Sequence, residues 1–344
     1  MNLTVSGPGR IAALDIARGF AILAVVASHA QLLWAPAAPW IYEFYVPLFF
    51  VLAGYLASAS RPLQRLGRMV RQYFTVCAVL FVIWFVLYPL RGEDTDLIGR
   101  AVFSVVYGRF YDPANPVLVN CLWAGQLWFL TLLVTATALF YLVRRLLGPP
   151  WRLAVALVVL LAAAQLLRAT PVLLPWCLDT APMGAAYMLM GHALAGLDFA
   201  RQPFQPRQLP LLIVCAVAYI QRHDTYDLNL RVYGRYADWR GTVSFFLAGT
   251  AGTVLCIAVC ALLARVPLVS TVLQAAGRHS MEIFCWHIFG LWVLDSVWMR
   301  LPDAFPADAP AARLLFALLA LVGIPLVCSF VPSLQRRNRR NSKQ

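Results

Sequence analysis

Long apolar runs dominate the chain and alternate with short polar segments. A run of about 17 to 24 apolar residues is long enough to cross a bilayer as a helix. Ten such runs predict an all-α, polytopic membrane protein with about ten transmembrane helices. They cover residues 11–34, 39–60, 72–90, 123–143, 151–167, 181–198, 208–221, 242–264, 280–299 and 311–332. The seventh run is the weakest, because its apolar part extends only from Leu209 to Ile220.

The first run, IAALDIARGFAILAVVASHAQLLW, contains three ionisable residues, Asp15, Arg18 and His29. Such residues are rare in membrane helices and usually face the bundle interior or a water-filled cavity. At about 100° per residue, the eleven steps from Arg18 to His29 leave an offset of roughly 20°, and Asp15 lies one turn before Arg18. All three therefore project from one face, with Arg18 and His29 roughly 16 Å apart along the axis. The alternative is a structural ion pair between Asp15 and Arg18, with His29 hydrogen-bonded to a neighbouring helix.

The composition agrees with a membrane protein. Of the 344 residues, 61% are hydrophobic and 12% charged, which is far too apolar for a soluble domain. No small-residue cleavage site follows the first run, so we expect a retained helix rather than a signal peptide. The strong preference for arginine over lysine favours a GC-rich bacterial genome. We expect a multi-pass protein of the bacterial inner (cytoplasmic) membrane.

The positive charge is distributed in a way that predicts topology. With the N-terminus in the cytoplasm, every cytoplasmic segment has an excess of arginine or lysine, whereas positive and negative residues balance on the outer side. We therefore expect both termini in the cytoplasm, one membrane domain over residues 1–335 and a basic cytoplasmic tail at 336–344. The net charge of +13 then reflects topology, and we expect no nucleic-acid partner.

Cysteines fall mostly inside the apolar runs, where buried thiols are the ordinary interpretation. Their spacing matches no zinc site, and we expect no metal. Cys121 and Cys177 both lie near the predicted outer side, so a disulfide between them is one alternative and two free thiols the other.

Two outer loops, 91–121 and 221–241, are long and mix arginine, aspartate and tyrosine. Aromatic rings beside Asp, Asn and Arg suit sugar recognition, because a pyranose has an apolar face to stack and hydroxyls to hydrogen-bond. An interfacial aromatic belt with solvated ion pairs explains the same composition. The candidates for binding an acceptor sugar are Trp128, which follows Gln126 at the outer surface, and Asp227, Asn229 and Tyr233.

On the cytoplasmic side, RPLQRLGRMVRQY places Arg65, Arg68 and Arg71 along one helix flank. This cluster is a positive-inside anchor, and it also provides guanidinium groups for the phosphates of an anionic donor.

Near the C-terminus, AAGRHSMEIFCWHIFG provides two further candidates, Glu282 and His287. Ser280 and His287 share a helix face, whereas Glu282 and His287 do not, so a local Ser/His/Glu triad is not expected. The chain has no P-loop, dinucleotide fingerprint or GxSxG elbow, which argues against a nucleoside triphosphatase and an α/β-hydrolase.

Five segments, in order, carry a family resemblance: LDIARGFAILAVVASHA, YVPLFFVLAGYLAS, RLGRMVR, LWFL and GRHSMEIFCWH. They resemble the integral-membrane acyltransferase 3 family, and within it the sugar O-acetyltransferases of bacterial exopolysaccharide pathways. The most specific element is an arginine and a histidine separated by ten residues on the first span, here Arg18 and His29. The family's paired arginines correspond to two of Arg65, Arg68 and Arg71. The chain departs from related sequences at Phe44-Tyr45, where they often have Phe-His.

The resemblance implies transfer of an acyl group, most often acetyl, from cytosolic acyl-CoA to a sugar or lipid-linked oligosaccharide. A neutral His29 would act as the base, and Arg18 would bind the donor or polarise its thioester, with Asp15 orienting Arg18. Direct transfer and an acyl-histidine intermediate are both compatible with these residues. No bound cofactor is expected, because acetyl-CoA is a substrate.

Two other functions fit a polytopic helical protein with polar groups inside it. A transporter or flippase for a lipid-linked sugar would favour broken helices and two similar halves, and no similarity between the halves is visible. A structural partner of a polysaccharide assembly complex, with a degenerate active site, would still bind its ligands but would catalyse no reaction.

Overall fold

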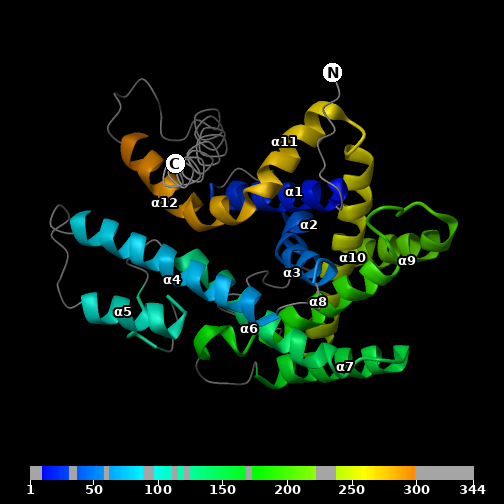
Figure 1. Cartoon of the computed structure of the whole chain (residues 1–344), viewed down its shortest axis with the longest axis horizontal. Helices are drawn as coiled ribbons and strands as arrows, with labels where there is room; N and C mark the ends of the chain where they lie inside the picture. The colour runs from blue at the N-terminus through cyan, green and yellow to red at the C-terminus, as the bar shows by residue number, and fades with distance from the viewer. Residues whose placement is uncertain are drawn as a thin grey trace, which may run out of the picture. The chain divides into compact units, whose positions relative to one another are not determined.

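The computed structural model describes residues 10–30, 37–57, 62–87, 97–110, 115–119, 124–167, 173–221 and 238–298. These ranges fold into helices and contain no strand (Figure 1). The α-helices are α1 (Ala12–His29), α2 (Ala38–Tyr42), α3 (Tyr45–Tyr55), α4 (Pro62–Leu87), α5 (Leu97–Tyr107), α6 (Trp128–Arg144), α7 (Pro150–Leu167), α8 (Ala181–Gly196), α9 (Leu209–Ile220), α10 (Trp239–Leu263), α11 (Pro267–Arg278) and α12 (Ser280–Trp298).

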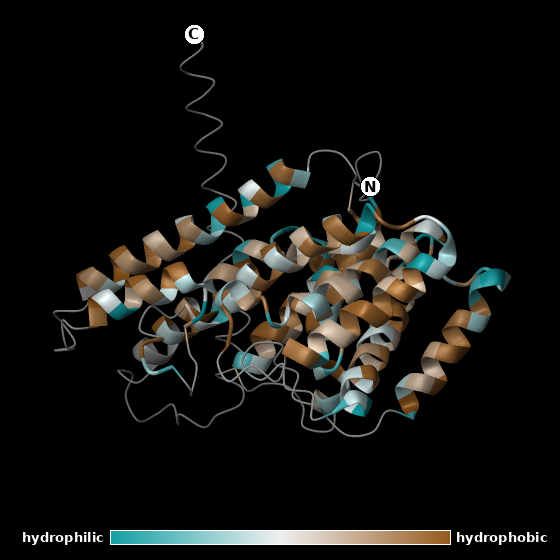
Figure 2. Ribbon diagram, turned by 90° about the horizontal axis from the view of Figure 1, so that it is seen from below, coloured by the Kyte–Doolittle hydropathy of each residue, from teal (hydrophilic) through white to brown (hydrophobic). Residues whose placement is uncertain are grey.

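Hydrophobic residues predominate along most of these helices (Figure 2). Five described segments are long and apolar enough to cross a membrane. They are Ala12–His29, Pro62–Val86, Gly125–Arg144, Pro150–Leu167 and Trp239–Leu263. The protein is therefore a helical, multi-pass membrane protein, as predicted. The total of ten spans and the orientation of the termini stay predictions.

Several boundaries differ from the predicted ones. The run at 39–60 is divided into α2 and α3, and α4 begins at Pro62, ten residues before the predicted span at 72–90. Proline is favoured in the first turn because the backbone N–H it lacks would have no partner there, and α7 and α11 also begin at proline. The predicted span at 311–332 and the tail at 336–344 lie outside the described residues.

Two helices were not predicted as elements. α5 lies in the loop predicted at 91–121, and α11 lies between the predicted spans at 242–264 and 280–299. Both have a pronounced apolar face and a polar face, so neither is a continuous apolar run. A search for apolar runs misses such amphipathic helices.

The chain divides into two units. One contains residues 1–41 and 259–344, and the other contains residues 42–258. In the first unit, α1 packs against α11 and α12. In the second, α3 packs against α8, α8 also packs against α6 and α7, and α4 packs against α6.

Within the first unit, glycines bring α1 and α11 into backbone contact. A Cβ atom added at Gly19 would lie 1.9 Å from the carbonyl oxygen of Leu273, and one added at Gly277 would lie 1.9 Å from that of Asp15. No larger side chain fits without separating the helices. Close crossings of this kind are typical of membrane helices, where packing and Cα–H···O contacts stabilise association.

In the second unit, hydrogen bonds join the loop before α8 to α5 and α6. Arg109, which is 2% exposed, forms an ion pair with Asp179 and donates from Nε to the carbonyl of Leu174 at 2.8 Å. Trp176 Nε1 donates to the carbonyl of Val106 at 2.9 Å. These bonds satisfy backbone carbonyls that have no helical partner, and they hold the segment before α8 against the end of α5.

Candidate active site

The ionisable residues of α1 begin with a carboxylate between two arginines. Asp15 is 8% exposed, with Oδ1 3.8 Å from Arg18 Nη1 and Oδ2 3.6 Å from Arg10 Nε. The side chain of Arg18 is 28% exposed and therefore keeps contact with the surroundings of the helix. The contact of the Asp15 carbonyl with Gly277 holds this turn of α1 against α11. The expected ion pair between Asp15 and Arg18 is thus present, and its charges lie at the closest point of the helix crossing.

His29 is the last residue of α1 and is exposed. Its ring centroid lies 5.1 Å from that of His287 on α12, with an interplanar angle of 46°. The sequence had indicated both histidines, but not that they meet. Helix periodicity relates residues on one helix, whereas this contact depends on how α12 packs against α1.

His287 is fully buried, and its Nδ1 lies 2.8 Å from the carbonyl oxygen of Phe284. A carbonyl only accepts, so Nδ1 carries the proton and Nε2 carries a lone pair. Nε2 has no hydrogen-bond partner among the described residues. The neutral ring therefore keeps an unused acceptor.

The other candidate on α12, Glu282, lies in its first turn and is half-buried. It is five residues from His287 and so lies on a different part of the helix surface. Ser280, which opens α12, is 8% exposed. The structure thus brings the ring of His287 to that of His29.

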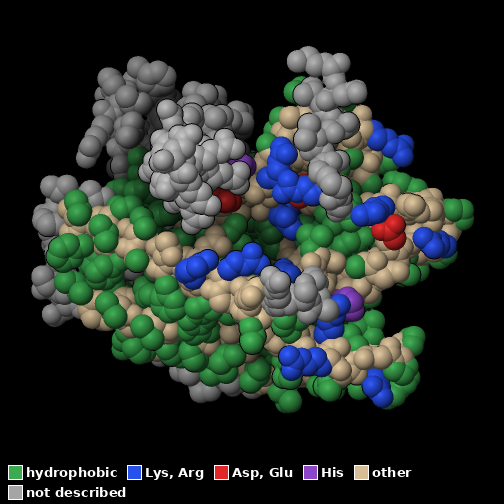
Figure 3. All heavy atoms as spheres, viewed as in Figure 1, with side chains coloured by type: hydrophobic (Ala, Val, Ile, Leu, Met, Phe, Trp, Pro, Cys, Tyr) green, Lys and Arg blue, Asp and Glu red, His purple; other side chains and the backbone are tan. Residues whose placement is uncertain are grey.

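The three arginines of the predicted donor site lie on the first turns of α4. Arg65 is half-buried, whereas Arg68 and Arg71 are exposed. In Figure 3, basic side chains follow the N-terminal half of α4 and hydrophobic side chains cover the surface beyond it. The helix therefore presents a basic flank at one end and an apolar surface along the rest.

Trp128 begins α6 and is only 8% exposed. Its carbonyl lies 3.4 Å from the buried thiol of Cys177, which is a free cysteine, and Cys121 lies outside the described residues. The buried indole has little surface on which a sugar could stack, although its proposed role stays a prediction. The remaining acceptor candidates, Asp227, Asn229 and Tyr233, lie outside the described residues.

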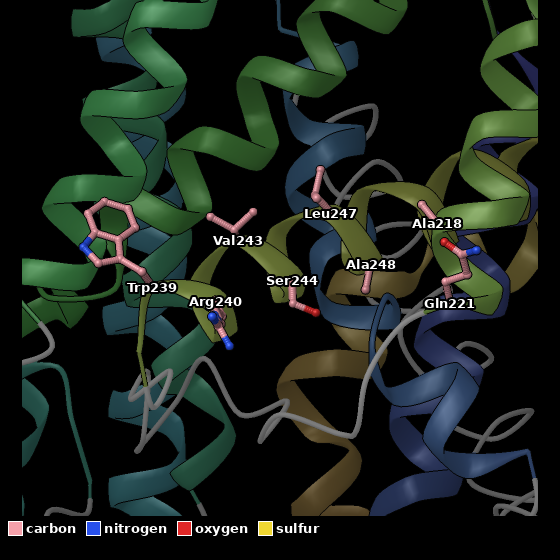
Figure 4. Close-up of a pocket in the computed structure, with 8 residues that line it drawn as sticks. All are labelled: Ala218, Gln221, Trp239, Arg240, Val243, Ser244, Leu247 and Ala248. Carbon is pink, nitrogen blue, oxygen red and sulfur yellow. The ribbon is translucent and has the colours of Figure 1, made fainter.

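A groove of about 570 Å³ lies between the end of α9 and the start of α10. Its wall is mostly apolar, with a few polar side chains near the ends of the helices (Figure 4). The lining residues are Ala218, Gln221, Trp239, Arg240, Val243, Ser244, Leu247 and Ala248. Gln221 and Trp239 lie on either side of the segment that contains Asp227, Asn229 and Tyr233 in sequence. The groove was not predicted, because it is formed by two helices rather than by one motif.

The fold is that of a multi-pass helical membrane protein. Its candidate site combines Asp15, Arg18 and His29 of α1 with His287 of α12. The acyltransferase 3 family model, described as an acyltransferase domain, matches residues 11–331. The chain therefore belongs to this family of membrane acyltransferases. No curated protein and no solved structure matches the chain.

Proposed function

We propose that this acyltransferase moves an acetyl or other short acyl group from cytosolic acyl-CoA to a sugar hydroxyl. The acceptor is an exopolysaccharide, its lipid-linked repeat unit or another cell-surface glycan. The observation that carries the proposal is the exposed His29 on the same membrane helix as the Asp15–Arg18 pair. Ionisable groups are costly in a membrane helix, so their presence indicates use.

In the proposed reaction, neutral His29 removes the proton of the sugar hydroxyl as its oxygen attacks the thioester carbonyl. The carbon–sulfur bond then breaks, and the CoA thiolate takes the proton back from His29. A neutral imidazole is suited to this role because one of its ring nitrogens accepts a proton. In an alternative order, the acyl group passes through a nitrogen of His29 before it reaches the sugar.

Arg18 supplies the fixed positive charge. It is partly exposed, and the carboxylate of Asp15 lies beside it. In the proposed site it binds the phosphopantetheine arm of the donor. Asp15 limits the positions that the guanidinium can adopt.

The basic flank of α4 is the proposed binding site for the CoA phosphates. Arg68 and Arg71 are exposed and Arg65 is half-buried, so all three have surface left for a ligand. Guanidinium groups bind phosphate through two parallel N–H bonds, which gives geometric selectivity as well as charge.

The test is transfer of labelled acetyl from acetyl-CoA into glycan by membranes that contain this chain. The membranes are supplied with lipid-linked glycans of the host and compared with membranes from the empty vector. We expect label in the glycan only with the chain present, and competition by unlabelled acetyl-CoA.

Labelled succinyl-CoA, run in parallel, separates acetyl from other short acyl groups. If neither donor labels intact acceptors, the acyl-CoA assignment is wrong. A dependence of glycan transport on the chain would then favour the flippase function instead.

A further inference from the structure

The buried histidine of α12 is the feature that the proposed chemistry leaves unused. His287 has 0% exposure, its Nδ1–H is bonded to the carbonyl of Phe284, and Nε2 is an acceptor without a partner among the described residues. Buried polar atoms are nearly always hydrogen-bonded, and one that is not needs an explanation. Nε2 is at the far end of the ring from the bond to the α12 backbone, and a side chain of a neighbouring helix can supply its partner.

The neighbouring ring is that of His29 on α1, at 5.1 Å between centroids. Two imidazoles joined by one N–H···N bond have centroids about 5 Å apart, because each nitrogen lies roughly 1.1 Å from its centroid and the bond spans about 2.9 Å. The observed spacing is therefore short enough for such a bond to form. The bond is not formed in this structure, where Nε2 of His287 has no hydrogen-bond partner among the described residues, and a change in the orientation of the His29 ring would bring a ring N–H to it.

We propose that His287 is a positioning residue for His29. Its Nε2 accepts a hydrogen bond from one ring N–H of His29, and the other ring nitrogen of His29 keeps its lone pair for the acceptor hydroxyl. A neutral imidazole has one donor and one acceptor nitrogen, so fixing the donor also fixes the acceptor. The Phe284 carbonyl selects the tautomer of His287, and His287 in turn selects that of His29. The inference rests on the proposed function, in which His29 is the base.

Three substitutions separate this role from simple packing. The amide of His287→Gln reaches the position of Nε2 and offers an acceptor oxygen there. The amide of His287→Asn reaches only the position of Nδ1, and His287→Phe keeps a ring beside His29 without any acceptor. The same Gln and Asn changes at His192, which contacts Phe140 on another helix pair, are the matched controls.

We expect His287→Asn and His287→Phe to lower kcat by about ten- to a hundredfold, the range seen when the group that orients a ligating histidine is lost. His287→Gln should remain within a few-fold of wild type, and the KM for acyl-CoA should stay unchanged in all three. Both His192 variants should retain wild-type kcat. Equal kcat values for the Gln and Asn variants of His287 would overturn the proposal.

A second readout does not depend on activity. The chain has five histidines, so the ring carbon shifts of His29 can be assigned by NMR from labelled protein with and without His29. Wild type and His287→Gln should show one tautomer of His29, and His287→Asn a mixture of two. A mixture already present in wild type would refute the positioning role. If wild type transferred no acyl group, the proposed function would fail, and the NMR result would still decide whether His287 positions His29.

Discussion

Two pairs of helices in this protein cross through close glycine–backbone contacts. The side chains beside the two crossings are different. In one unit, Gly19 of α1 and Gly277 of α11 each face a backbone carbonyl of the other helix. In the other unit, Gly54 of α3 faces the carbonyl of Met188 on α8, and Gly191 of α8 faces that of Val51 on α3. In all four cases an added Cβ atom would lie 1.9 Å from the carbonyl oxygen.

The side chains around the two crossings are different. α3 and α8 contain no aspartate, glutamate, lysine or arginine, and the one histidine of the pair, His192, contacts the ring of Phe140. At the other crossing, Asp15 and Arg18 lie next to the contact itself, and His29 follows on the same helix. A tight glycine crossing is thus ordinary membrane architecture. The ionisable groups placed at one of the two crossings are what indicate a reaction centre there.

The largest expected difference is in the loss of kcat when the histidine of each helix pair is replaced by alanine. His29→Ala should lower kcat by about two to four orders of magnitude, the usual effect of removing a general base. His192→Ala should leave transfer unchanged, because that ring packs against Phe140. Both variants should elute as folded protein and bind CoA. Comparable losses of kcat from the two substitutions would mean that His29 supports activity through packing and not as the base.

Replacing a glycine by alanine should reduce the stability of the protein similarly at the two crossings. Gly19→Ala and Gly54→Ala each force a Cβ atom against a backbone carbonyl, so each should reduce stability by about 1–3 kcal/mol, as overpacking does. Thermal unfolding in detergent measures this effect, with Gly99→Ala as the control because nothing lies within 4 Å of the added Cβ there. A Gly19→Ala melting curve that matches the control would show that α1 and α11 are not in close contact.

A smaller effect is expected at Asp15. Asp15→Asn removes the negative charge between Arg10 and Arg18 while keeping the size of the side chain. Partly exposed ion pairs contribute up to about 1 kcal/mol, so kcat/KM should fall by about fivefold or less. Steady-state kinetics with acyl-CoA measures it. A loss as large as that of His29→Ala would instead make Asp15 a participant in the reaction.

The smallest effect should come from α4. Arg68→Gln should raise the KM for acyl-CoA about two- to threefold and leave kcat unchanged, because one exposed guanidinium contributes little alone. Arg152→Gln on α7 is the matched control, since its guanidinium lies over the ring of Trp151 at 5.5 Å. An Arg68→Gln enzyme with the KM of wild type would contradict the donor site proposed on α4.

The helices that cross the membrane could be predicted because each is a long apolar run. The bounds of α7 and α10 lie within a few residues of the predicted spans, whereas α1 ends at His29 and its predicted span extended to residue 34. α11 was missed because a helix of twelve residues with one polar face gives no such run. The start of α4 was placed ten residues late because its first turns carry the arginines, which lower the mean hydropathy there.

The candidate site could be predicted only as far as one helix determines it. The common face of Asp15, Arg18 and His29 follows from helix periodicity, and the ion pair between Asp15 and Arg18 follows from their spacing. The approach of His287 to His29 and that of Gly277 to Asp15 depend on tertiary packing. Small residues at 19 and 277 were a signal for close approach, but a single sequence does not show which helix faces which.

The most direct measurement of the central claim is chemical modification of histidines in the wild-type protein. Diethylpyrocarbonate reacts with neutral, accessible imidazoles, and His29 is exposed whereas His287 is buried. Residual transferase activity is plotted against the modified fraction of each histidine, read by mass spectrometry, with and without acyl-CoA and glycan. The account predicts that inactivation follows modification of His29 alone and that the substrates protect this residue. Full activity in protein whose His29 is completely modified would contradict it.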